Sequence, residues 1–308
     1  MDTQVQNNTV PKSCIIANPI YDTVFKRMME NERIAKFFLG TILEKQIVSV
    51  EVRPQEFTYK GDIKQIKKQE KSEPEYSNIG YSIYRIDFMA TIKTEKGKYR
   101  KILIEVQKSW DEDDLMRFRN YLGEQYKKKD IVNGKEVALP ITTIYILGFN
   151  LAGIETACMR VKRNYEDMLE DNKPMAVESP FVESLTHDSY IIQTKRITDR
   201  RYTTNLDKLL SIFEQNHFFI DGSEVSKHYK MQSEDENIKL ITDVLFEMIA
   251  NQKEREEIEK EAEALRIIDD LFGKKNREQK QMLEEQKQML EEKDREIAEL
   301  KRLLNNRQ

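Results

Sequence analysis

Two β-rich runs joined by a short link constrain the fold of this chain more than any other feature of its sequence. The runs are Tyr81–Ile92 and Tyr99–Gln107, and the link between them is TEKGK. A short glycine-containing link between two such runs predicts an antiparallel hairpin. The helix-forming segment Glu112–Lys129 and the apolar run Ile141–Phe149 come next. Strand, helix and buried strand form a βαβ unit, so we expect an α/β domain with a mixed (α+β) sheet.

A carboxylate interrupts each run of the hairpin: Asp87 in the first and Glu105 in the second. Residues symmetric about Lys96 lie opposite each other, which puts the two Cβ atoms roughly 5 Å apart unless a bulge shifts the register. A hard divalent cation would remove the repulsion between them, and Gln107 lies on the same face as Glu105. The alternative is a sheet edge whose polar groups face water, or an ion pair of Arg85 with one carboxylate.

These residues resemble the PD-(D/E)XK nuclease superfamily, and more narrowly its recombination-promoting nuclease group, also named PD-(D/E)XK nuclease family transposases. The resemblance covers residues 18–215 and is carried by Tyr84–Asp87, LIEVQ at 103–107, the helix with Arg117 and Tyr121, and YDTVFKRMM at 21–29. It implies a restriction-endonuclease-like core flanked by helices. It also implies a divalent-metal-dependent DNA endonuclease that hydrolyses phosphodiester bonds with a metal-activated water, tied to recombination or mobile-element movement.

The resemblance also assigns roles to single residues. Asp87, Glu105 and the backbone carbonyl of Val106 would bind Mg²⁺, with Mn²⁺ or Ca²⁺ as alternatives. Gln107 would position the attacking water, and Asp22 would be an additional catalytic acid; its alternative is a first-turn acid that favours the helix dipole. Many members of the superfamily carry Lys where this chain has Gln107. An amide offers a hydrogen bond there but no positive charge.

Three residues are candidates for contacts with DNA: Lys26, Arg117 and Tyr121. Because Arg117 and Tyr121 lie four apart on one helix, an amphipathic packing pair is an equal alternative for them. The partner implied is DNA, with no membrane and no organic cofactor. The three histidines lack ligand spacing, and the sequence has no Gly-rich phosphate loop or nucleophile elbow.

Three other functions stay open. The first is a catalytically inactive DNA-binding or regulatory protein on a nuclease fold, and the second is a nuclease that serves phage defence. The third is a scaffold that works through its C-terminal helix. Deleting residues 231–308 should abolish the function of a scaffold and leave a nuclease at least weakly active.

Outside the hairpin, apolar spacing predicts further elements. Helices are expected over residues 19–46, 206–215 and 240–249, and strands over 47–52 and 189–194. Residues 60–80 form a polar, lysine-rich insertion or loop. EQKQMLE occurs at 278–284 and again at 285–291, which is a heptad repeat. It predicts either a short coiled coil over 278–304 that joins two copies of the chain or a solvated single helix.

Length and composition set the domain organisation. The 308 residues fit a disordered tail over 1–17, a nuclease domain over 18–230 and a C-terminal helical segment over 231–308. Two cysteines exclude a disulfide framework. The sequence has no apolar run of membrane-spanning length and no signal-peptide pattern, so we expect a cytoplasmic protein. The net charge of −4 gathers beyond residue 230 and leaves the first 230 residues close to neutral, which neither supports nor excludes a basic groove.

Overall fold

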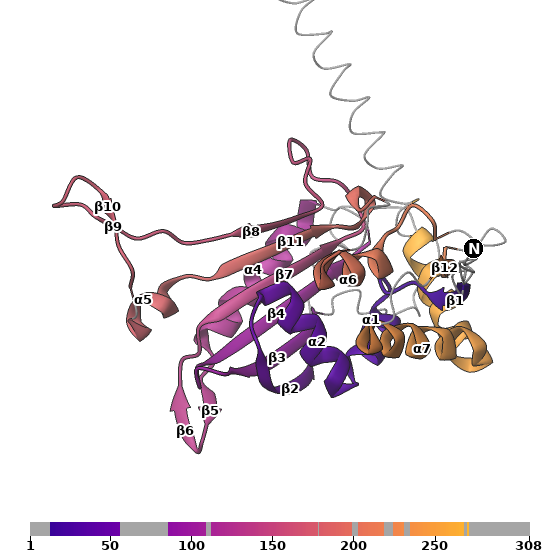
Figure 1. Cartoon of the computed structure of the whole chain (residues 1–308), viewed down its shortest axis with the longest axis horizontal. Helices are drawn as coiled ribbons and strands as arrows, with labels where there is room; N and C mark the ends of the chain where they lie inside the picture. The colour runs from indigo at the N-terminus through magenta and orange to yellow at the C-terminus, as the bar shows by residue number, and fades with distance from the viewer. Residues whose placement is uncertain are drawn as a thin grey trace, which may run out of the picture. The chain divides into compact units, whose positions relative to one another are not determined.

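The core of the chain is a six-stranded mixed sheet with the strand order β2-β3-β4-β7-β11-β8 (Figure 1). These strands are β2 (Ile47–Gln55), β3 (Ile86–Thr94), β4 (Tyr99–Gln107), β7 (Ile141–Leu147), β11 (Asp188–Gln193) and β8 (Cys158–Val161). β4, β7 and β11 are parallel, whereas β2 and β3 join β4 as an antiparallel meander and β8 runs antiparallel to β11. The expected βαβ unit is therefore present as β4, α4 (Glu112–Lys127) and β7.

The computed structural model describes a defined part of the chain. Its residues are 13–55, 86–108, 112–177, 179–198, 203–218, 224–230, 235–267 and 270, and the side chains of 52–55, 86–87 and 112–117 are not included. The expected insertion over 60–80, the expected coiled coil over 278–304 and residues 81–85 of the first hairpin run lie outside the described residues.

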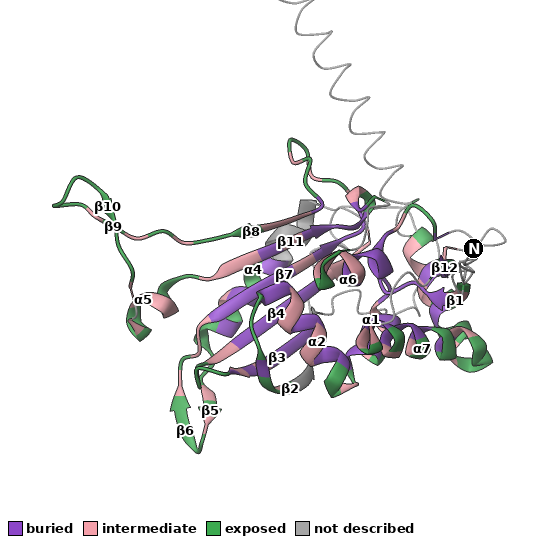
Figure 2. Cartoon of the chain, viewed as in Figure 1, coloured by how far each residue is buried: buried purple, intermediate pink, exposed green. Residues whose placement is uncertain are grey.

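Helices cover both faces of the sheet. On one face α4 packs through Phe118, Tyr121 and Leu122 against Leu103 of β4 and its neighbours. On the other face lie α1 (Asp22–Met29), α2 (Glu32–Leu43) and α6 (Asn205–Phe213). Edge-to-face and tilted aromatic contacts fill that side, and their rings are Phe25, Phe38, Phe88 and Phe213. The central strands β3, β4 and β7 are accordingly the most buried part of the sheet (Figure 2).

The N-terminal helical segment differs from the prediction. A single helix was expected over 19–46, but the chain forms two, α1 and α2, divided at Glu30 and Asn31. The side chain of Asn31 accepts hydrogen bonds from the backbone N–H groups of Arg33 and Ile34 and so begins a new helix. The apolar spacing continues across the break because both helices bury their inner faces on the same side of the sheet.

The compact unit extends beyond both boundaries expected for the nuclease domain. Residues 13–17, expected in a disordered tail, form β1 (Ser13–Ala17), which pairs with β12 (Ser226–Lys230). α7 (Glu236–Ala250) packs on β1 and on α1, α2 and α6. The chain divides into units 1–258 and 259–308, so α7 belongs to the first unit and not to a separate C-terminal segment.

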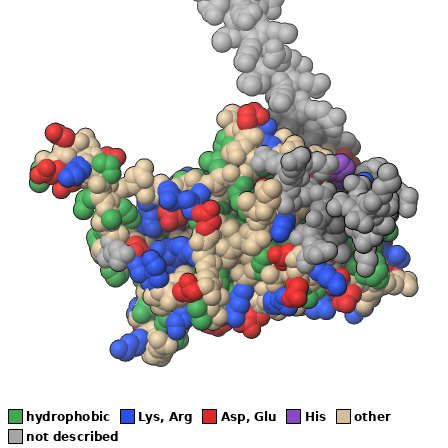
Figure 3. Space-filling view, viewed as in Figure 1, with side chains coloured by type: hydrophobic (Ala, Val, Ile, Leu, Met, Phe, Trp, Pro, Cys, Tyr) green, Lys and Arg blue, Asp and Glu red, His purple; other side chains and the backbone are tan. Residues whose placement is uncertain are grey.

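An arm leaves the edge of the sheet after β8 and returns to it at β11 (Figure 1). It contains the short hairpin β9 (Glu166–Asp167) and β10 (Lys173–Pro174), followed by α5 (Pro180–Leu185). Acidic side chains gather at its end (Figure 3). A second small hairpin, β5 (Asp130–Val132) and β6 (Lys135–Val137), precedes β7, and the 3₁₀ turn η1 (Thr194–Arg196) follows β11. Among the described helices, none has the length and apolar character that crossing a bilayer requires.

Candidate functional site

The hairpin of β3 and β4 has the symmetric register expected from its sequence. Lys93 pairs with Tyr99 and Phe88 pairs with Ile104, so the strands are centred on Lys96. The turn closes through Gly97, whose φ of 70° favours glycine. One step beyond Phe88 and Ile104 the two strands reach positions 87 and 105. The backbone of Asp87 lies in β3, but its side chain lies outside the described part of the structure.

A bulge lies in β3 at this same point, on the side of β2. Between the pairs Arg53–Met89 and Gln55–Ile86, β2 advances by two residues and β3 by three. The extra residue falls at Asp87 or Phe88. Bulges occur often beside active sites because they redirect a side chain without ending the strand. The register with β4 on the other side is unbroken as far as Phe88.

Glu105 is a buried carboxylate in the middle of the sheet. It is 4% exposed and lies two residues from Leu103, on the face that α4 covers. Its partner in the parallel ladder is Tyr145 of β7. Burial raises the pKa of Tyr145 to about 12, with the negative charge of Glu105 adding to the shift. Burial likewise raises the pKa of Tyr121 on α4, and the same charge contributes. Two phenols thus lie close enough to the Glu105 carboxylate for its charge to act on both.

The α4 side of the site contains Tyr121 but leaves Arg117 undescribed. Tyr121 is 6% exposed and packs in the cluster with Leu103 and Met89. Its side chain therefore faces the hairpin. The backbone of Arg117 lies in α4, and its side chain is outside the described residues.

β4 ends in a narrow junction with β7. Val106 and Gln107 are half-buried there, in contrast to Glu105. The N–H of Gly148, just past β7, donates a 2.7 Å hydrogen bond to the carbonyl of Gln107. A Cβ at Gly148 would lie 2.6 Å from the carbonyl oxygen of Lys108, so only glycine fits. This close approach fixes the backbone on which Val106 and Gln107 are presented.

The beginning of α1 lies at the same end of β4. Lys108 donates hydrogen bonds to the Tyr21 hydroxyl at 2.8 Å and to the Glu224 carboxylate at 2.5 Å. Burial lowers the pKa of Lys108, but these two hydrogen bonds outweigh it and raise the pKa above its usual value. Asp22, next to Tyr21, is the first residue of α1 and pairs with Lys26 at 2.6 Å. The structure thus brings the start of α1 to the end of the strand that carries Glu105.

The donor set at the end of β4 suits a hard cation. It consists of the carboxylate of Glu105, the carbonyl of Val106 and the amide of Gln107, and oxygen donors of this kind are preferred by Mg²⁺. Among the described side chains, no group of three His, Cys, Asp or Glu residues is close enough to bind a metal. The predicted metal-binding group includes Asp87, whose side chain lies outside the described part of the structure.

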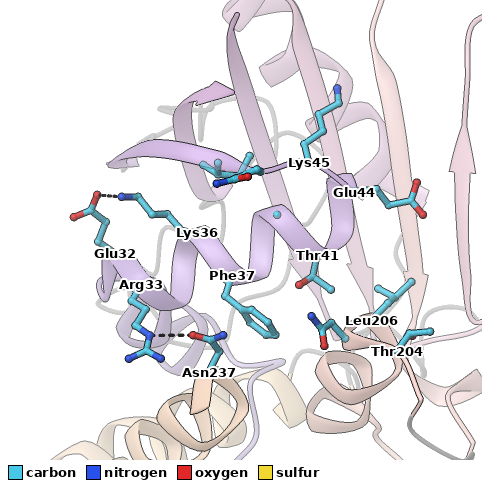
Figure 4. A pocket seen from close by; sticks show the side chains of 14 residues that line it. Glu32, Arg33, Lys36, Phe37, Thr41, Glu44, Lys45, Thr204, Leu206 and Asn237 are labelled. Carbon is cyan, nitrogen blue, oxygen red and sulfur yellow. Dashed lines mark hydrogen bonds and ion pairs between the residues drawn. The ribbon is translucent and has the colours of Figure 1, made fainter. Parts of the chain in front are cut away.

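A separate hollow lies away from this end of β4. It has a volume of about 930 Å³ and is lined by α2, the chain that follows it and the start of α6 (Figure 4). Two of its cationic side chains are already engaged: Lys36 pairs with Glu32 at 2.8 Å, and Arg33 donates to Asn237 at 2.9 Å. None of the sequence-predicted site residues lines it.

Sequence reasoning missed three residues of this region: Lys108, Tyr145 and Gly148. Lys108 directly follows Gln107, and a charged residue at the end of a buried strand is a usable signal. Tyr145 carries a hydroxyl within an otherwise apolar run, and this is a weaker signal. Gly148 could not have been singled out, because its role depends on the distance between two strands.

No protein-family model, curated protein or solved structure matches the chain.

Proposed function

We propose that the chain is a divalent-metal-dependent endonuclease of the PD-(D/E)XK type, with a restriction-endonuclease-like core. The observation that carries the proposal is the buried carboxylate of Glu105, at the carboxyl end of a central strand. Glu105 and Asp87 each lie one residue beyond the paired residues Ile104 and Phe88. Burying a carboxylate costs free energy that needs compensation. A cation shared by two carboxylates supplies that compensation.

In this proposal Asp87, Glu105 and the carbonyl of Val106 hold Mg²⁺. When bound, the ion lowers the pKa of a coordinated water and offsets negative charge on the scissile phosphate. The amide of Gln107 accepts or donates a hydrogen bond to orient the attacking water. Tyr121 and Tyr145 exclude bulk water from one side of Glu105 and so strengthen its electrostatic interactions.

The start of α1 completes the proposed site. Asp22 adds a third carboxylate, and Lys26 holds it in place through their 2.6 Å ion pair. Lys26 and Arg117 are proposed to contact DNA phosphates, which sequence-independent binding needs. Tyr121 was the third candidate for a DNA contact. Its side chain faces Glu105 instead, and its proposed role is to shield that carboxylate from water.

Conservative variants test the proposal. Asp87→Asn and Glu105→Gln keep the shape of each side chain and remove its charge. We expect each variant to nick supercoiled plasmid in Mg²⁺ at least 100-fold more slowly than the unchanged protein, and EDTA to abolish the activity. Glu136→Gln is the control, because Glu136 is an exposed carboxylate on β6 that pairs only with Lys129 among the described residues. If both site variants are folded and as fast as the control, the site is wrong.

One observation favours a second function, a catalytically inactive DNA-binding protein on the same fold. Gln107 brings no positive charge to the place where many nucleases of the superfamily have a lysine. This alternative predicts that the unchanged protein retards DNA in a gel but does not cleave it in Mg²⁺, Mn²⁺ or Ca²⁺. Cleavage that depends on Glu105 excludes it.

A further inference from the structure

The described residues of the arm, 161–177 and 179–186, are tied to the sheet edge by Arg163. Arg163 pairs with Asp188 of β11 at 3.1 Å. The same guanidinium donates to the backbone carbonyls of Val182, Glu183 and Thr186 at 3.1–3.4 Å. These bonds fix α5 and the base of the hairpin together. The arm is therefore a defined projection of the first unit.

The arm exposes apolar side chains to an unusual extent. It holds more than half of the exposed large hydrophobic residues of the described chain: Val161, Met168, Leu169, Met175, Phe181 and Leu185. Met168 and Leu169 at the tip are 85% and 95% exposed, and Phe181 on α5 is 72% exposed. If each full side chain offers 150–200 Å², the exposed parts together amount to roughly 600–800 Å². A standard protein interface buries about 800 Å² on each partner, so the arm supplies most of one half.

Charge excludes a phosphate-bearing partner for the tip of the arm. Four carboxylates lie between positions 166 and 171, and Lys173 is the one cation near them: the acids are Glu166, Asp167, Glu170 and Asp171. Figure 3 shows acidic side chains at the far end of the arm. Nucleic acids and anionic membranes would be repelled there. The surface that fits this tip is apolar and basic.

The base of the arm has the opposite charge. Figure 3 shows Lys and Arg side chains where the arm leaves the sheet. The cations of the adjoining segments are Lys98, Arg100, Arg160 and Lys162, and Arg160 pairs with Glu44 at 3.0 Å. Glu183 lies 3.0 Å from Arg100 and 4.0 Å from Lys98, so one carboxylate is shared by two cations. Burial and repulsion from Arg100 and Arg160 lower the pKa of nearby Lys45, and the carboxylates of Asp188 and Glu183 offset part of this shift. Cations crowded in this way favour the approach of carboxylates.

We propose that the arm is a dimerisation element that docks onto a second copy of this chain, with the acidic tip of each arm against the basic base of the other. In a twofold dimer, if the tip of one protomer contacts the base of its partner, the partner's tip contacts the base of the first protomer. Because tip and base carry opposite charges, both contacts are attractive. From Val161 to Glu170 an extended chain spans roughly 30 Å, so the two arms would lie antiparallel along their length. The exposed apolar side chains are then covered by their counterparts in the partner.

Cross-linking between labelled copies tests this geometry. The photoreactive residue p-benzoylphenylalanine replaces Leu169 in the full chain, and ¹⁴N and ¹⁵N proteins are mixed before illumination. Mass spectrometry should find mixed-isotope peptides that join position 169 to segments 98–100 or 160–163. Ile131, at 71% exposure on the other small hairpin, is the matched position for a control label. A cross-link confined to one chain, to another surface, or no more abundant than that of the control overturns the proposal.

Charge exchange gives a second test by sedimentation equilibrium. Reversal at the tip (Glu166→Lys with Glu170→Lys) should weaken the dimer at least tenfold, and so should reversal at the base (Lys98→Glu with Lys162→Glu). All four substitutions in one chain should restore most of the affinity, because tip and base are complementary again. A monomeric unchanged protein, dimers that none of the reversals weaken, or a fourfold variant weaker than either pair would each contradict the arm as the dimer contact.

Discussion

At the scale of single residues, the end of β4 depends on one lysine. Lys108 joins Tyr21, beside Asp22, to Glu224 in the segment before β12. It is 15% exposed, and its ammonium also lies 4.8 Å from the centre of the Tyr21 ring. Three segments distant in sequence therefore meet at one side chain. If Asp22 takes part in the metal site, Lys108 is a positioning residue for it.

Replacing Lys108 should weaken both the fold and the proposed metal site. Lys108→Met keeps the aliphatic stem but loses two hydrogen bonds, and since Glu224 is partly exposed we expect a loss of about 1–2 kcal/mol in the free energy of unfolding. Half-maximal nicking should need several-fold more Mg²⁺, with Lys108→Arg restoring most of it. Urea unfolding and a Mg²⁺ titration measure the two effects. An unchanged Mg²⁺ requirement in Lys108→Met would show that the lysine only stabilises the fold.

At the scale of elements, a capping residue separates α1 from α2. Asn31→Ala removes the side-chain acceptor for the N–H groups of Arg33 and Ile34. We expect it to lower the free energy of unfolding by about 1 kcal/mol, whereas Asn31→Ser should be nearly neutral. The midpoint of urea unfolding distinguishes them. Equal midpoints for the two variants would mean that packing alone, without the cap, determines the break.

The same scale shows which elements sequence can predict. The hairpin register was predictable because a short link and period-two alternation leave one symmetric pairing, and Lys93–Tyr99 and Phe88–Ile104 confirm it. The break at Asn31 was not predictable. Two consecutive helices that bury the same side against one sheet face have the apolar spacing that a single helix would have. Strand β1 and the arm were missed for a different reason. Both contain strands too short to show a periodic pattern, and β1 in addition depends on β12, a partner far away in sequence.

For the candidate site, the sequence predicted the residues but not their surroundings. Glu105 and Gln107 follow from alternation on one strand, and the structure adds that Glu105 is 4% exposed beside Tyr145. That environment depends on β7 being the parallel neighbour of β4, and period-two spacing within a strand carries no information about neighbours. The junction at Gly148 is of the same kind.

At the scale of the whole molecule, α7 determines where the chain can be cut. Four of its apolar side chains are almost fully buried against the first unit: Ile238, Ile241, Leu245 and Met248. At 1.5–3 kcal/mol each, their burial contributes up to about 6–12 kcal/mol, which is comparable with the total stability of a domain. A deletion of residues 231–308 would therefore unfold the first unit, and loss of activity in that variant would say nothing about a scaffold.

A chain ending at residue 270 avoids this problem, because it keeps the whole first unit and removes the heptad repeat. We expect it to unfold within a few degrees of the full chain and to retain Mg²⁺-dependent nicking, whereas a chain ending at Lys230 should lose cooperative unfolding. Circular dichroism melts and plasmid nicking measure both. A cooperative melt in the shorter chain would show that α7 is dispensable. Loss of nicking from the folded 1–270 chain would place an essential part of the function in residues 271–308.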